Sequence, residues 1–327
     1  MVLVTAAAGV GKSRLCQELL GALRRRGGPP LVVMARGDPV SAGSPFGLIA
    51  PATRRVVGVL EGEPLAVRQH KIRARVARHV PEPDRARIGE FLGELLGTPF
   101  PDEHRRELRG ARADPILMGD QMSRAWQDWL EAECDAQPVI LVMEDLHWGD
   151  LPSVTFVDAA LRVLRKKPLM VLALARPEVH TLFPELWAGR GLTRMELGEL
   201  SPRASAQLVR RVLGAEVPEA TVARLVEQSG GNAFYLEELV RAAAEGKGDA
   251  PPGTILAMVQ SRIEALAPES RRVLRAASVF GQVFCNDKAF VRHNARPAEG
   301  SPPIPPLKLV SCCLDGRSLA RASGCRS

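Results

Sequence analysis

The chain has 327 residues, of which 46% are hydrophobic and 4% aromatic, and it carries a formal net charge of +7. Residues 285–327 hold seven Lys/Arg and three Asp/Glu, a net charge of +4, which leaves only +3 for residues 1–284. So small an excess argues against a basic nucleic-acid-binding face. No stretch is apolar enough to span a membrane and no signal segment opens the chain, so we expect a cytoplasmic protein without a membrane partner.

The first residues have the pattern of a phosphate-binding loop. Val2–Val4 predicts a buried strand, Ala6–Ser13 (AAAGVGKS) follows, and an amphipathic helix comes next. We place four leucines on the apolar face of that helix: Leu15, Leu19, Leu20 and Leu23. Strand, glycine-rich turn and helix together point backbone N–H groups at an anion. We expect ATP there, bound by Gly9, Val10, Gly11, Lys12, Ser13 and Arg14.

Two side chains of this loop carry the expected chemistry. Lys12 is expected to reach the β- and γ-phosphates, and the Ser13 hydroxyl to coordinate Mg²⁺. One position departs from the G-x-x-x-x-G-K-S/T pattern, because Ala6 replaces the first glycine. We expect the added methyl group to strain the loop without abolishing it. The alternative is a small-residue turn that happens to precede Lys-Ser, which the strand and helix around it disfavour.

The next part of the chain is mainly helical. Leu31–Ala35 predicts a second buried strand, and residues 46–133 predict helices broken near 81–83 and 98–101. One helix carries an aromatic stripe, made of Met118, Met122, Trp126, Trp129 and Leu130. We assign this stripe to the core rather than to base stacking.

A pair of carboxylates follows the third predicted strand. Val139–Met143 is a wholly apolar run, as in parallel strands buried on both faces, and Glu144 and Asp145 come directly after it. Carboxylates at such a strand end lie beside the phosphate loop in parallel-sheet proteins. By position we assign Glu144 to the metal and Asp145 to the attacking water, although the reverse assignment stays open.

Another charged side chain follows the fourth predicted strand. After a predicted helix at 152–165, Leu169–Leu174 reads as a buried strand, and Arg176 lies just beyond it. At that place a cation can stabilise charge on the γ-phosphate, so Arg176 is a candidate sensor and catalytic residue. The alternative, which we rate as equal, is an arginine that caps the strand end or meets Glu178. Thr193–Leu197 can be the last strand.

From Ser201 onward the pattern is wholly helical. Ser201-Pro202 is a good start for a helix, residues 219–228 predict a second, and Asn232 is placed to cap a third. The first of these has an apolar face of Leu208, Val209, Val212 and Leu213. Pro251–Gly253 reads as a linker before two short helices, near 254–266 and 269–278.

We therefore divide the chain into four parts. Residues 1–198 form an α/β core with a parallel sheet, 199–250 a helical lid, 251–284 a further helical segment, and 285–327 a disordered tail without apolar periodicity. For the tail we keep the alternatives of frameshifted sequence and of a proline-rich docking segment. The six Cys and six His lack ligand spacing, so we expect no metal besides a nucleotide-bound Mg²⁺.

Three segments resemble one known family. Gly9–Leu15 (GVGKSRL), Glu144–Asp150 (EDLHWGD) and Gly230–Leu239 (GGNAFYLEEL) are similar to the Orc1-like AAA-type ATPase module of bacterial STAND signal-transduction regulators. Ala35–Asp38 and Ser44–Phe46 are similar to members that follow a serine/threonine kinase domain. The resemblance covers roughly residues 1–284. It implies a P-loop NTPase fold, an ATP-dependent switch, and the start of a winged-helix domain at 251–284.

The chain also departs from that family. Ala233 replaces a proline at the lid turn that packs against the nucleotide in the family, and the segment that encloses adenine before the first strand has no counterpart. We therefore expect a fragment of a larger regulator, whose protein partners or parent domains are missing. Nucleotide-dependent self-association is a further expectation. Kinase motifs such as H-R-D and D-F-G do not occur.

Our functional hypothesis is an ATP-binding switch module that hydrolyses Mg·ATP slowly to control a regulatory protein. Two alternatives stay open. One is a non-catalytic remnant or interaction scaffold, favoured by Ala6, Ala233 and the unusual tail. The other is a DNA-binding ATPase related to origin-recognition proteins, which the near-neutral body disfavours.

Overall fold

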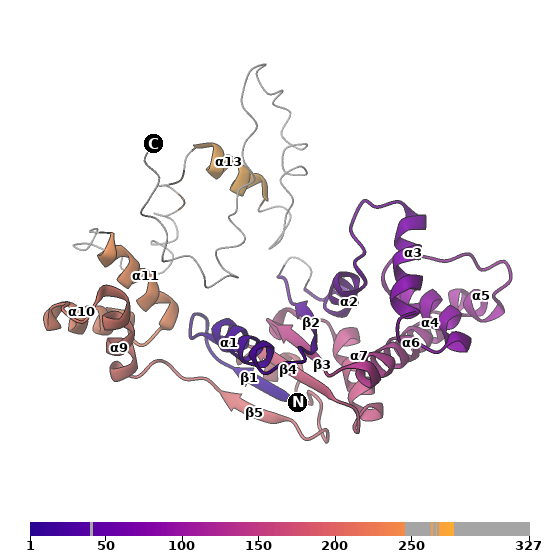
Figure 1. Ribbon diagram of the computed structural model, residues 1–327, viewed down its shortest axis with the longest axis horizontal. Coiled ribbons are helices and arrows are strands. Elements are labelled where there is room, and N and C mark those ends of the chain that lie inside the picture. Colours follow the sequence, from indigo (N-terminus) through magenta and orange to yellow (C-terminus); the bar gives the residue numbers. More distant parts are fainter. Residues whose placement is uncertain (40–41, 246–262, 264–265, 267, 278–327) are drawn as a thin grey trace, which may run out of the picture. The chain divides into compact units, whose positions relative to one another are not determined.

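The core is a five-stranded parallel sheet. The computed structural model describes residues 1–39, 42–245, 263, 266 and 268–277. The strands are β1 (Val2–Thr5), β2 (Leu31–Arg36), β3 (Val139–Glu144), β4 (Leu169–Ala175) and β5 (Thr193–Glu196), in the order β2-β3-β4-β1-β5 (Figure 1). All four pairings are parallel, which confirms the predicted α/β fold class. The carboxyl ends of the strands therefore lie along one edge, where such sheets bind ligands.

Alternating side chains of the strands form two cores, one on each face of the sheet. Helix α1 (Lys12–Arg25) covers one face, where Cys16 and Leu20 pack on Val4, Val142 and neighbouring residues. Our prediction for α1 was wrong in part, because Leu15 is 37% exposed and Cys16, 1% exposed, takes the inner position. The leucine pattern misplaced the buried face because it left the small, apolar Cys16 out.

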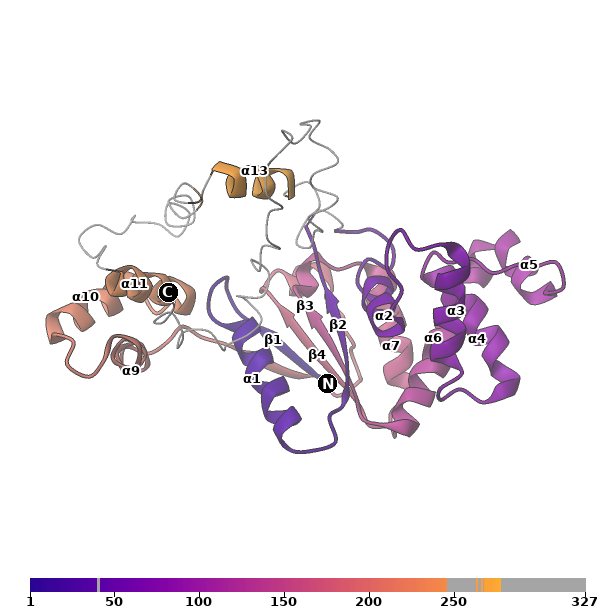
Figure 2. The same cartoon turned by 45° about the horizontal axis from the view of Figure 1, so that its top comes forward.

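The helices on the other side of the sheet come from two stretches of the chain, one between β2 and β3 and one between β3 and β4, and part of the first set packs on other helices rather than on the sheet (Figure 2). The first set is α2 (Ile49–Val57), α3 (Leu65–Val76), α4 (Glu82–Leu95), α5 (Arg106–Ala113) and α6 (Pro115–Ala136). The breaks predicted near 81–83 and 98–101 fall at the two ends of α4. The aromatic stripe is core, as predicted, since Trp126 and Trp129 are at most 1% exposed.

A buried aspartate organises the connection from β3 to β4. After β3 the chain makes a single 3-10 turn, η1 (Leu146–Trp148), and then enters α7 (Leu151–Val163). Asp150, 3% exposed, caps α7 by accepting from the N–H and hydroxyl of Ser153. It also accepts the N–H groups of Phe46 and Leu48, which ties the loop before α2 to this connection. A short helix, α8 (Val179–Leu182), follows β4.

The C-terminal lid is a bundle of three helices, α9 (Pro202–Leu213), α10 (Glu219–Ser229) and α11 (Ala233–Ala244), which contact one another. Ser201 and Asn232 cap α9 and α11 with their side chains, as their positions predicted. Part of the predicted apolar face of α9 was wrong, because Val212 is 51% exposed while Val209 is buried.

The first compact unit of the chain runs from Met1 to Ile255. Beyond it the described residues include α13 (Pro268–Ala277), within one residue of the helix predicted at 269–278. The linker at 251–253, nearly all of the helix predicted at 254–266, and the tail at 285–327 lie outside the described residues. The four domain boundaries and the winged-helix start thus stay predictions. In the described part, no helix is long and apolar enough to cross a membrane.

Candidate functional site

The loop between β1 and α1 has the backbone of a phosphate cradle. Gly9 and Gly11 adopt φ values of 79° and 116°, in the left-handed region that favours glycine. Ala6 is buried, and its N–H donates to the carbonyl of Ala175 over 3.2 Å. It is not among the described residues with positive φ, so its methyl group meets no left-handed backbone strain. Alanine fits here because the first turn off β1 needs no left-handed residue.

Lys12 lies over this loop at the start of α1. Its Nζ donates to the carbonyls of Ala6 and Ala7 over 2.8 and 2.9 Å. Burial lowers the pKa of Lys12, opposed chiefly by the charge of Asp145. Ser13 is exposed, and Arg14 points to Glu18, with 2.7 Å between the charged groups. Among the described residues no side chain caps α1, so its first N–H groups are available to an anion.

The lid touches the phosphate loop directly. Asn232 Nδ2 donates to the carbonyl of Ala8 over 3.0 Å, and the N–H of Phe234 donates to the carbonyl of Gly9 over 2.9 Å. The same Asn232 caps α11 through Oδ1, which accepts the N–H of Tyr235 over 3.0 Å. The sequence predicted the cap but not the contact with the loop, which joins residues 224 positions apart.

The two carboxylates at the end of β3 have different surroundings. Glu144 ends β3, is 7% exposed, and forms an ion pair with Arg36 of the adjacent β2, 2.8 Å between nitrogen and oxygen. Burial raises the pKa of Glu144, and the charge of Arg36 opposes this increase. Asp145 has a left-handed backbone with φ 51°. In the described part of the chain its carboxylate has no hydrogen-bond or ion-pair partner.

Charges from three elements converge on Lys12. Asp145, Arg176 and Glu178 all influence its pKa, so the ends of β3 and β4 and the start of α1 share one electrostatic environment. Arg176 follows β4 and is partly buried. No carboxylate of the described residues lies within ion-pair distance of its guanidinium, so the alternative of a pair with Glu178 is not found. Two site contacts were missed in the sequence, the ion pair of Arg36 with Glu144 and the hydrogen bond of the Arg176 N–H to His147.

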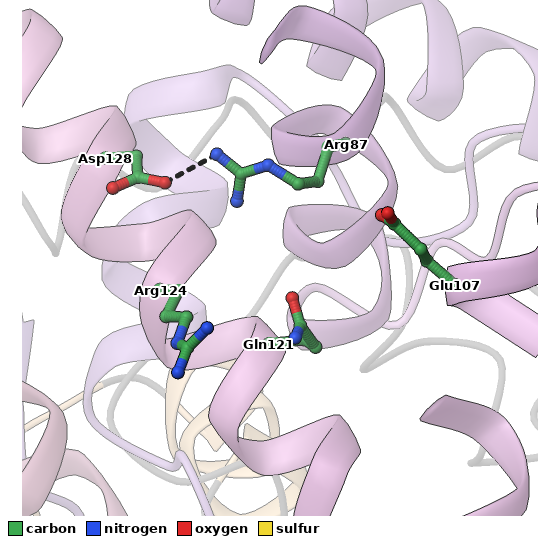
Figure 3. Close-up of a pocket in the computed structure, with 5 residues that line it drawn as sticks. All are labelled: Arg87, Glu107, Gln121, Arg124 and Asp128. Carbon is green, nitrogen blue, oxygen red and sulfur yellow. Dashed lines mark hydrogen bonds and ion pairs between the residues drawn. The ribbon is translucent and has the colours of Figure 1, made fainter. Parts of the chain in front are cut away.

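The structure has a hollow away from the phosphate loop and another next to the strand that precedes it. One, of about 460 Å³, is lined by Arg87, Glu107, Gln121, Arg124 and Asp128 on α4, α5 and α6 (Figure 3). Its two arginines face two acids, and Arg87 already pairs with Asp128 over 2.6 Å. It therefore offers no net charge to a phosphate ligand. A second hollow of the same volume lies at the ends of β1 and β5.

The residues around the loop fit a magnesium nucleotide. The N-terminus of α1 is uncapped, and no described atom would lie within 4 Å of a Cβ at Gly11. A serine hydroxyl and a carboxylate, Ser13 and Glu144, are oxygen ligands of the kind that Mg²⁺ takes. Glu144 would have to share its charge with Arg36. The roles of Ser13 and Glu144 as magnesium ligands stay predictions.

Comparison with known proteins gives a family. The model of the AAA ATPase domain family matches residues 1–172. An uncharacterized protein of Rhizobium meliloti (strain 1021) is 27% identical over 186 residues, which are 51% of this chain and 17% of that protein. The chain thus spans less than a fifth of this relative.

Among solved structures, the Orc1 protein of Aeropyrum pernix in complex with DNA is 13% identical with a TM-score of 0.45, over 85% of this chain and 65% of that one. Drosophila ORC bound to DNA is 12% identical with a TM-score of 0.30, over 87% and 63%. Both scores are too low to indicate what this chain binds. The family match covers more than half of the chain and includes the phosphate loop and β3, and the chain therefore belongs to the AAA ATPase domain family.

Proposed function

We propose that this chain is an ATP-binding switch module that binds Mg·ATP at the β1–α1 loop, hydrolyses it slowly, and signals through its lid. The observation that carries the proposal is the direct contact of the lid with the phosphate loop, from Asn232 to Ala8 and from Phe234 to Gly9. A ligand that displaces the loop carbonyls must change these two hydrogen bonds. Binding at the loop is therefore coupled to the position of the lid.

Each site residue has a role in this proposal. Gly9, Gly11 and the first N–H groups of α1 surround the phosphates, and Lys12 exchanges its loop carbonyls for phosphate oxygens. Val10 is buried and supports the loop, whereas the exposed Arg14 lies at its rim. Ser13 and Glu144 would hold the Mg²⁺ of the nucleotide, which would supply positive charge to the phosphates.

Two charged groups that have no ion pair among the described residues complete the site. The Asp145 carboxylate is free to accept a proton from, and to orient, an attacking water. The Arg176 guanidinium is free to stabilise charge on the γ-phosphate. The regulatory role, the protein partners and nucleotide-dependent self-association belong to this proposal as well. The matched part of the chain spans only 17% of the length of the Rhizobium meliloti relative, so the activity of the whole protein is a proposal.

A second candidate is a module that no longer binds nucleotide. The ion pair of Glu144 with Arg36 favours it, because a guanidinium at 2.8 Å competes with Mg²⁺ for the carboxylate. The two candidates differ in a simple measurement, which is calorimetric titration of the full chain with Mg·ATP.

The matched variants are Lys12→Ala and Lys167→Ala. Lys167 is partly buried, pairs with Glu131 and Asp135, and precedes β4 at the edge of the sheet opposite the phosphate loop. We expect Lys12→Ala to weaken ATP binding about 10- to 100-fold, as for loss of a hydrogen bond to a charged group. Lys167→Ala should bind like the wild type. If the folded wild-type chain binds no ATP, the second candidate replaces the first. If it binds but Asp145→Asn turns over ATP as fast as the wild type, our assignment of Asp145 is wrong.

A further inference from the structure

His147 lies in η1, the turn that follows the two carboxylates, and it is 7% exposed. Its Nδ1 accepts the backbone N–H of Arg176 over 3.3 Å. This bond joins the end of β3 to the end of β4, outside the regular pairing of these two strands, whose register ends at Met143 and Ala173. The ring also packs on Trp148, with 5.2 Å between ring centroids.

The hydrogen bond defines the state of the imidazole. Because Nδ1 accepts an N–H group, it carries no proton, and the neutral ring holds its proton on Nε2. Burial lowers the pKa of His147, in agreement with a neutral ring. The charges of Asp145, Arg176, Glu178 and Lys12 all act on this ring, so it lies among the charged groups of the site.

This turn includes features that work against stability. His147 Nε2 is buried and has no hydrogen-bond partner among the described residues, and a buried polar atom without a partner destabilises the folded state. The preceding Asp145 is left-handed at φ 51°, a conformation that non-glycine residues seldom adopt. A phenylalanine would fill the same space without an unpaired polar atom. Such features cluster at functional sites, where the geometry they impose has a use.

We propose that His147 is a positioning residue of the ATP site: it holds the main chain of Arg176 and thereby directs the guanidinium toward the γ-phosphate. The inference rests on the proposed function for the role of Arg176, but the bond itself can be tested without nucleotide. Arg176 needs such a support because it follows the last residue of β4, and the chain turns away into Pro177 and α8 directly after it. Without this hydrogen bond, the pairing of the sheet would fix the main chain only up to Ala175, the residue before Arg176.

Three variants separate this role from simple packing. In His147→Asn the side-chain oxygen lies near the place of Nδ1 and can accept the Arg176 N–H, while in His147→Gln the amide extends toward the place of Nε2. His147→Phe keeps the ring and has no acceptor. The first readout is hydrogen exchange of the Arg176 amide in the nucleotide-free full chain. The second is the pair of ATPase constants kcat and KM, and the third is kcat of Arg176→Ala alone and combined with His147→Phe.

We expect the Asn variant to keep the hydrogen-exchange protection of the Arg176 amide and the wild-type kcat. The Gln and Phe variants should lose this protection, and their kcat should be about 10-fold lower with KM nearly unchanged. The combination with Arg176→Ala should be no slower than Arg176→Ala alone, because both changes remove one effect. Equal amide protection in Asn and Gln variants, or kcat rescued by Gln rather than Asn, overturns the inference. Since Asn and Gln are compared with each other, the decision does not depend on whether the Phe variant folds.

The outcome in which the wild type hydrolyses no ATP is separate. It removes the proposed catalytic function, while the amide exchange still decides whether His147 holds Arg176. Loss of protection in Gln but not in Asn then supports the positioning role in a site that binds without turnover. Protection unchanged in all variants overturns it.

Discussion

The contact between the lid and the phosphate loop makes a quantitative prediction for Gly9→Ala. A Cβ at Gly9 would lie 2.6 Å from Asn232 Oδ1 and 2.8 Å from Nδ2, far inside normal contact. The residue also has φ 79°, where alanine costs about 1–2 kcal/mol. If the Asn232 side chain rotates away, the bond to the Ala8 carbonyl and the cap on α11 are lost, about 1 kcal/mol each. The lid should therefore be destabilised against the loop by ~3–4 kcal/mol.

A double-mutant cycle tests the cause of this loss. Asn232→Ala alone removes the bond and the cap, about 2 kcal/mol together. In the double variant the side-chain amide of residue 232 is gone, so the methyl group at residue 9 adds only its backbone strain. The loss of lid stability should then be ~3–4 kcal/mol, whereas independent effects would add to ~5–6 kcal/mol. Gly11→Ala is the matched control, because it has left-handed backbone strain, φ 116°, but no described atom within 4 Å of its Cβ.

The assay is hydrogen exchange of the Phe234 amide in the nucleotide-free full chain. Its acceptor is the carbonyl of Gly9, so its protection reports separation of the lid from the loop and depends on neither substituted side chain. We expect strong coupling of Gly9→Ala with Asn232→Ala, and additive behaviour of Gly11→Ala with Asn232→Ala. If Gly9→Ala and Asn232→Ala also add to within about 0.5 kcal/mol, the side chains do not meet and the reasoning is refuted.

Three further predictions concern buried polar groups. Asp150→Ala removes the acceptor of four hydrogen bonds from Phe46, Leu48 and Ser153, and we expect urea unfolding to show a loss of about 3 kcal/mol or more, with less than 1 kcal/mol contradicting the role. Glu144 has a raised pKa in the folded chain, so its ionisation costs stability as pH rises above about 4, the range of an unfolded glutamate. Without Mg²⁺ or nucleotide, Glu144→Gln should thus gain stability relative to the wild type between about pH 4 and neutral pH, and a difference that is constant with pH contradicts this. Burial raises the pKa of the Cys16 thiol to about 11, so its alkylation, followed by peptide mass spectrometry, should be slow in the native chain and rapid in denaturant; rapid native labelling would show that the thiol is accessible.

Local patterns in the sequence determined most of the secondary structure. Wholly apolar runs identify β1 to β4, because parallel strands covered on both faces need apolar residues on both. Caps such as Ser201 and Asn232 mark helix starts because a short side-chain acceptor next to an uncapped N–H is a local requirement. The phosphate loop is likewise contiguous, so its glycines and Lys12 could be found by spacing alone.

Local patterns were less reliable for the buried face of a helix. Leucine spacing placed Leu15 on the buried face of α1, whereas Cys16 is the residue that packs against the sheet. The apolar pattern of α9 likewise placed Val212 on the buried face of that helix, but Val212 is exposed. Both helices have enough apolar residues for more than one face, and only the surface against which they pack selects between them.

The contacts that give the site its character were decided by tertiary structure. The pairing of β2 with β3 places Arg36 beside Glu144, the ends of β3 and β4 bring His147 to the Arg176 amide, and the packing of the lid brings Asn232 to Ala8. Each joins residues distant in the chain, and its geometry follows from strand register and helix packing, which residue spacing does not encode. The sequence by itself thus determined that a phosphate loop and two carboxylates occur, and the fold decided which partners they meet.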